Sequence, residues 1–102
     1  MASGRINTAE IIKRLVQRGG GTGVSNMEAT LLTDADKVDP FNMWAVLAVE
    51  ARINGKPGAW VVQTPNDGSQ DVVSRLLDGM VEQIMSNPDQ DRGSAATNRT
   101  TV

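Results

Sequence analysis

Residue type limits the chemistry available to this chain, because its 102 residues include no His, Cys or Tyr. These side chains supply most general bases near neutral pH, most soft-metal ligands and most thiol nucleophiles. Carboxylates, hydroxyls, amides and a few cations remain. A carboxylate pair such as Asp34 and Asp39 could act in acid–base catalysis, but no surrounding pattern indicates a cleft that would perturb their pKa values. We therefore expect a protein that is not an enzyme.

Two segments have part of the pattern of a ligand site. Asp34, Asp36 and Asp39 share an acidic loop, but the loop lacks the glycine and the closing glutamate of an EF-hand. Residues 19–23 form a glycine cluster. Such a cluster binds phosphate where it follows a strand and opens a helix. Here it follows a predicted helix, so it indicates a helix C-cap and a connector. We expect no metal, cofactor or small-molecule ligand.

Hydrophobic periodicity predicts two amphipathic helices and three strands. Asn7 and Glu10 have the spacing of a capping box at the start of the first helix. Apolar residues at every second position from Ala45 to Ile53 predict a strand that is buried on one face. The predicted elements are a helix over residues 8–18, strands over 25–33, 44–53 and 59–64, and a second helix over 70–85.

The order α-β-β-β-α predicts a single α+β domain over residues 1–86. Both helices are apolar on one side only, so we expect them to pack on one face of a three-stranded antiparallel sheet. Residues 87–102 are polar and show no hydrophobic periodicity. We expect these residues to form a polar C-terminal tail.

This element order, over residues 7–86, resembles that of the double-stranded-RNA-binding domain. In that family, basic residues at the start of the second helix contact phosphates across the groove. The matching positions here, residues 68–73, carry Asp71 and no cation. Each phosphate contact requires a cation, so the resemblance implies a shared topology and not RNA binding by that mode.

Helices on one face of the sheet would leave the opposite face uncovered. An uncovered patch with one or two tryptophans is unusually apolar for a monomer and indicates a docking partner. The alternative is that both tryptophans belong to the core, since the chain has few other large residues. The residues expected on the uncovered face are Leu32, Trp44, Val46, Ala48, Arg52 and Trp60.

The placement of Trp60 depends on the turn between the second and third strands. A five-residue turn over residues 54–58 sets Trp60 beside Arg52 on the uncovered face, where a cation–π contact can form. A four-residue turn instead places Trp60 opposite Ala51 in the core. We favour the five-residue turn.

Charge is distributed unevenly, although the formal net charge is only −2. The first helix is basic, whereas residues 24–43 and 65–85 are acidic. Opposite charges on the two helices could steer head-to-tail contact between copies. The alternative is that both are solvated helix faces with little energetic weight.

These patterns favour a protein–protein interaction protein or a structural assembly subunit that uses its sheet face or edge. The expected partner is another copy in a homo-oligomer, a larger assembly such as a phage particle, or a host protein blocked by a phage-encoded inhibitor. The alternative is a nucleic-acid-binding module whose affinity falls steeply with salt. Its candidate contacts are Arg5, Lys13, Arg14 and Arg18, with Arg52 and Lys56 as further cations.

The first residues contain no apolar segment of the kind that directs secretion. The longest apolar run, residues 44–49, is far too short for a membrane span. We therefore expect the protein in the cytoplasm or in a virion.

Overall fold

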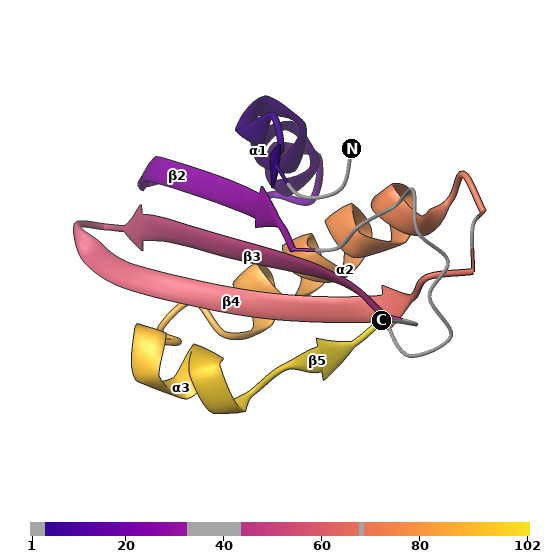
Figure 1. Cartoon of the computed structure of the whole chain (residues 1–102). Coiled ribbons are helices and arrows are strands. Elements are labelled where there is room, and N and C mark those ends of the chain that lie inside the picture. The colour runs from indigo at the N-terminus through magenta and orange to yellow at the C-terminus, as the bar shows by residue number, and fades with distance from the viewer. Residues whose placement is uncertain (1–3, 33–43, 68) are drawn as a thin grey trace.

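The computed structural model describes residues 4–32, 44–67 and 69–102 (Figure 1). The fold is α+β, as predicted, with three long antiparallel strands at the centre of a five-stranded sheet. Two-residue strands extend this sheet at both edges, and the last of them runs parallel to its neighbour. In sheet order the strands are β1 (Gly4–Arg5), β2 (Val24–Leu31), β3 (Trp44–Ile53), β4 (Lys56–Pro65) and β5 (Thr100–Thr101).

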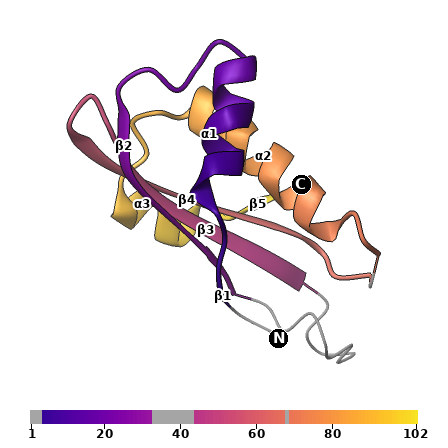
Figure 2. The same ribbon diagram turned by 90° about the horizontal axis from the view of Figure 1, so that it is seen from above.

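Two helices, α1 (Thr8–Gln17) and α2 (Val72–Ser86), lie side by side on one face of the sheet (Figure 2). The predicted α-β-β-β-α order therefore forms the central part of the fold. A third helix, α3 (Arg92–Thr97), lies at the edge formed by β4 (Figure 1). Within the described ranges, no helix is both long and apolar enough to cross a bilayer.

Both ends of α1 follow the local sequence. The Asn7 side chain accepts a hydrogen bond from the Ala9 N–H at 3.0 Å and so caps the first turn. At the other end, the Gly20 N–H donates to the Leu15 carbonyl at 2.8 Å and the Gly19 N–H donates to the Val16 carbonyl at 3.0 Å. These two bonds form a Schellman motif. The glycine cluster therefore begins with a helix C-cap, as predicted.

The hydrophobic core lies between the two helices and the sheet face that they cover. It is aliphatic apart from Trp60 and one methionine, because the chain has only three aromatic residues. The largest side chains that are fully buried there are Ile11, Leu15, Leu47, Trp60, Leu76 and Met80. Burial of these apolar surfaces is the main force that holds the helices on the sheet.

The hairpin between β3 and β4 corrects the expected placement of Trp60. The turn has only two residues, Asn54 and Gly55, with φ values of 53° and 80°, and it pairs Ile53 with Lys56. Positive φ at both central residues defines a type I′ turn, whose twist matches that of the flanking strands. Both expected turns are therefore wrong. Lys56, Pro57 and Gly58 belong to the strand.

In this register Trp60 lies opposite Val49 on the covered face and is 0% exposed. Its indole N–H donates to the carbonyl of Asn87, at the end of α2, at 2.8 Å. The expected contact between Trp60 and Arg52 is also wrong, because the two residues lie on opposite faces of the sheet. Trp60 is a core residue that ties β4 to α2.

The C-terminal segment, which we expected to form a polar tail, folds onto the domain. It contains α3 and β5, and Ala95 and Val102 pack against the rest of the fold. The Asp91 side chain caps α3 by accepting from the Ser94 N–H at 2.7 Å. The Val102 N–H donates to the Gln63 carbonyl at 2.7 Å. Most of the segment is held by backbone and polar contacts, which hydrophobic periodicity does not report.

Val102 also explains the glycine in the middle of α2. A Cβ added at Gly79 would lie 2.6 Å from the Val102 Cβ and 2.8 Å from its Cγ2. Glycine costs about 1 kcal/mol in a helix interior relative to alanine. Here its bare backbone leaves room for the last residue of the chain.

Candidate interaction surface

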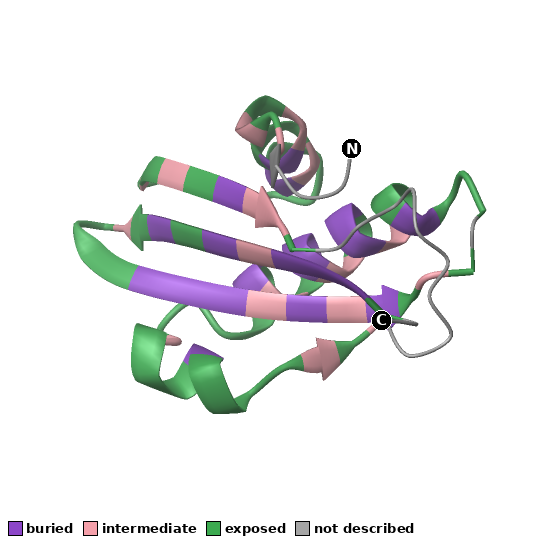
Figure 3. Ribbon diagram, in the orientation of Figure 1, coloured by how far each residue is buried: buried purple, intermediate pink, exposed green. Residues whose placement is uncertain are grey.

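The sheet face opposite α1 and α2, hereafter the open face, points toward the viewer in Figures 1 and 3. Strand alternation places every second residue of β3 on it, and the register adds the partners on β2 and β4. On β3 these residues are Trp44, Val46, Ala48, Glu50 and Arg52. On β2 they are Ser25, Glu28 and Thr30, with Leu32 directly after the strand, and on β4 they are Pro57, Ala59, Val61, Gln63 and Pro65.

One end of the open face is apolar. Leu32 is 53% exposed and Trp44 is 42% exposed, although both have large hydrophobic side chains. The Leu32 N–H donates to the Val46 carbonyl at 2.8 Å, which continues the β2–β3 pairing and sets Leu32 beside Val46. Ala48 lies between Thr30 and Val61 in the next row. The structure therefore places Leu32, Trp44, Val46 and Ala48 on one face, as the alternation predicted. Val46 is nevertheless buried, at 8% exposure, so its expected exposure on this face is wrong.

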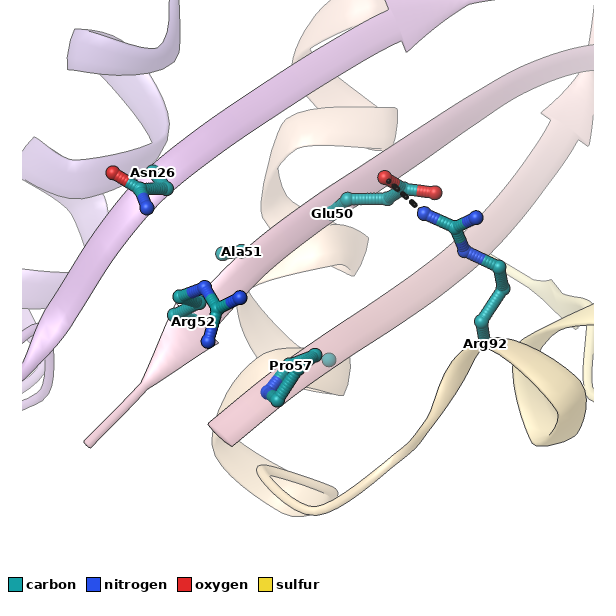
Figure 4. Close-up of a pocket in the computed structure, with 7 residues that line it drawn as sticks. Asn26, Glu50, Ala51, Arg52, Pro57 and Arg92 are labelled. Atoms are coloured by element: carbon teal, nitrogen blue, oxygen red, sulfur yellow. Dashed lines mark hydrogen bonds and ion pairs between the residues drawn. The ribbon is translucent and has the colours of Figure 1, made fainter. Parts of the chain in front are cut away.

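The other end of the open face is charged. An Arg92 Nη2 atom, from the start of α3, lies 2.9 Å from Glu50 Oε2. Arg52 donates from Nη1 to the Gly55 carbonyl at 2.9 Å. Figure 4 shows these two guanidinium groups on opposite sides of a small pocket, with Asn26 across the sheet from them.

This pocket has a volume of about 180 Å³, and Ala51 and Gly58 line it together with the polar side chains. It lies where β2 shifts its register against β3 between Ser25 and Glu28. Asn26 has a φ of 53° at this bulge. A bulge bends its strand and interrupts regular pairing, so it opens space beside Arg52. Neither the bulge nor the contact of Arg92 with Glu50 could be predicted from local periodicity.

Both edges of the sheet are covered in part by the chain itself. At β2, β1 pairs with Thr30 and Leu31, and the Ile6 N–H donates to the Ala29 carbonyl at 3.1 Å. At β4, β5 pairs with Val62 and Gln63. The Gln90 carbonyl accepts from the Ala59 N–H at 2.9 Å, and the Gln90 side chain donates to the Ala59 carbonyl at 3.1 Å. Covered edges resist strand addition, whereas β1 does not extend along residues 24–27 of β2.

The basic residues of α1 are paired with acidic residues within the chain. Arg14 forms ion pairs with Glu10 and Asp78, and Arg18 lies 2.6 Å from Glu82. Burial opposes the charge of Arg14, but hydrogen bonds to the two carboxylates outweigh this effect and raise its pKa. The opposite charges of the two helices therefore meet within one chain as ion pairs that are largely exposed, each worth up to about 1 kcal/mol. Head-to-tail contact between copies through these charges stays a prediction.

The other cations proposed for nucleic-acid binding do not gather on one surface. Lys13 is exposed on α1, and Arg52 lies on the open face. Lys56 is at the hairpin, with its Nζ 3.6 Å from Asp89. Arg5 pairs with Thr30 through its position in β1. The structure thus brings no continuous basic patch together from these residues in the part of the chain that it describes.

The acidic loop with Asp34, Asp36 and Asp39 lies outside the described residues. Among the residues that are described, no group of three or more carboxylates is placed to hold a metal ion. A comparison with known protein families, curated proteins and solved structures finds no match for this chain. Function must therefore be inferred from the surfaces themselves.

Proposed function

We propose that this protein is a non-enzymatic interaction or assembly subunit that binds a protein partner through the open face. The observation that carries this proposal is the exposure of Leu32 and Trp44, at 53% and 42%, on a sheet face that α1 and α2 do not cover. Aromatic and aliphatic side chains that gather in this way are typical of protein interfaces. A sheet holds them rigidly, so docking costs little conformational entropy.

Charge favours a protein partner over a nucleic acid. Within the described part of the chain, Arg14, Arg18, Lys56, Arg75 and Arg92 all lie within ion-pair distance of a carboxylate. A nucleic acid would have to compete with these carboxylates for each cation. An apolar surface with few unpaired charges suits a protein interface better.

The proposal can be tested by covalent capture at defined positions. A photo-crosslinking amino acid is placed at Leu32 on the open face or, as a matched control, at Val16 on α1, which is 60% exposed. Both variants are expressed in cells that make the protein naturally and are irradiated. We expect one recurrent cross-linked product from position 32 and none from position 16.

Sedimentation velocity then shows whether the captured partner is a second copy or a different protein. Equal cross-linking from the two positions, or no product from position 32, would contradict the proposal. Circular dichroism of both variants shows that the comparison is made between folded proteins.

A further inference from the structure

We infer that the partner is a different protein, whose docking segment presents aliphatic side chains to the Trp44 end of the open face and a carboxylate to Arg52. This inference rests on the proposed function and specifies the chemistry of the partner. It follows from the polarity of the open face, from the unpaired charge of Arg52 and from the symmetry of self-association.

The open face changes character along β3. Its residues run from Trp44, Val46 and Ala48, which are apolar, to Glu50 and Arg52, which are charged. At about 3.3 Å per residue, the two ends are about 26 Å apart. A partner segment that covers this length meets an apolar surface first and a charged one afterwards, so the face fixes the direction in which the segment lies.

The Arg52 guanidinium, at the charged end of the open face, is available to pair with a carboxylate of a partner. In the described part of the chain it donates to the Gly55 carbonyl and has no carboxylate within ion-pair distance. A guanidinium carries five N–H donors, so most of those of Arg52 remain available. Glu50, by contrast, is already paired with Arg92 at 2.9 Å.

The pocket beside Arg52 has room for the group that would pair with it. Its volume of about 180 Å³ exceeds that of a carboxylate, and Asn26 supplies a further hydrogen-bonding side chain at its rim. A carboxylate is flat and accepts two parallel hydrogen bonds from a guanidinium. The pocket is also lined by Glu50 and Arg92, which pair with each other, so the charge of Arg52 is left in excess. An Asp or Glu side chain of a docking segment therefore matches this site in charge and in shape.

A second copy of the chain matches the open face poorly. In a two-fold dimer with stacked sheets, the strands of the two copies run either parallel or antiparallel across the interface. The parallel arrangement centred on β3 sets Arg52 above Arg52 of the other copy, and the centred antiparallel arrangement sets Arg52 above Trp44. An antiparallel arrangement shifted along the strand can set Arg52 above Glu50 of the other copy, but that carboxylate is already paired with Arg92. This shift also moves the apolar end of each sheet past the end of the facing β3 and leaves it uncovered, so a different protein fits better.

A nucleic acid also matches the open face poorly. Phosphates follow one another along a nucleic-acid backbone, and each phosphate contact needs a cation. The apolar end of the open face, from Trp44 to Ala48, offers none. A protein segment can instead place one carboxylate at Arg52 and aliphatic side chains on the apolar end.

The test is a selection from a random linear peptide library on the full-length chain. We expect enrichment of peptides that combine aliphatic residues with Asp or Glu. One enriched peptide is then synthesised, and its affinity is measured for the wild type, Arg52→Gln, Leu32→Lys and the control Lys13→Gln, because Lys13 is an exposed cation on α1.

We expect Arg52→Gln and Leu32→Lys each to weaken binding by about fivefold or more, and Lys13→Gln to leave it unchanged. Raised salt should weaken binding to the wild type and have little effect on Arg52→Gln. The same chain is titrated with a single-stranded DNA oligonucleotide. Oligonucleotide binding that competes with the peptide would overturn the inference.

The outcomes separate this inference from the proposed function. If Leu32→Lys weakens binding but Arg52→Gln behaves like Lys13→Gln, the open face docks proteins without the carboxylate contact, and the inference is wrong. If enriched peptides are insensitive to Leu32→Lys, or if none is enriched, both the inference and the proposed function are contradicted.

Discussion

Replacement of Gly79 by alanine should destabilise this protein, although the same change stabilises an ordinary helix. Alanine in a helix interior gains about 1 kcal/mol over glycine. Here the new Cβ would lie 2.6 Å from the Val102 Cβ and 2.8 Å from Cγ2, closer than atoms can pack. If Val102 stays in place, overpacking of this kind costs about 1–3 kcal/mol. If Val102 instead moves away, the contacts of β5 are lost.

We therefore expect Gly79→Ala to lower the free energy of unfolding by up to about 2 kcal/mol in a urea titration, which is the overpacking cost less the helical gain of alanine. The matched control is Gly93→Ala in α3, where the nearest atom to an added Cβ is Asp91 Oδ1 at 3.6 Å. This control should leave stability unchanged or raise it. The double variant Gly79→Ala/Val102→Gly removes the clash and should recover the helical gain of alanine. Stabilisation by Gly79→Ala alone would refute the docking of the C-terminus between α2 and β4.

Three further predictions follow from the contacts of single side chains. Trp60→Phe removes a buried N–H donor and part of a core side chain, so the free energy of unfolding should fall by about 1–3 kcal/mol. The pKa of Asp91 is held below its ordinary value of 3.8, chiefly by the hydrogen bond from the Ser94 N–H. This stabilisation of α3 is complete above that value and is lost as pH falls through the folded pKa, so the protection factor of the Ser94 amide against hydrogen exchange should fall in acid. Asp91→Asn should abolish this acid dependence. Asp78→Asn removes an exposed partner of Arg14 and should cost up to about 1 kcal/mol at low salt and less at high salt, as measured by thermal unfolding.

The central elements could be predicted because their signals are local. These short-range patterns include the apolar stripe of α1, its N-cap at Asn7 and the Schellman motif at its C-terminus. They also include the apolar alternation from Ala45 to Ile53. The alternation also placed Leu32 and Trp44 on one face. The hairpin register was missed because Asn54 and Gly55 form a two-residue turn within a segment that also contains Pro57 and Gly58.

The contacts that hold the C-terminal segment on the sheet could not be predicted because they join residues that are distant in the sequence. The C-terminal segment has apolar contacts through Ala95 and Val102, which is too few for a periodic signal. Gln90 satisfies the backbone of Ala59 with two hydrogen bonds, one through its own carbonyl and one through its side chain. Arg92 reaches Glu50 only because α3 lies beside β4. The charged end of the open face is therefore visible only in three dimensions.

Acrylamide quenching of tryptophan fluorescence tests the docking role of the open face most directly. Trp60 is 0% exposed and already shielded, so quenching reports Trp44, which is 42% exposed. The measurement compares the free chain with its complex with a tryptophan-free peptide from the selection. Docking on the open face predicts that complex formation shields Trp44 and lowers the quenching constant. A quenching constant that stays the same in the saturated complex would contradict it.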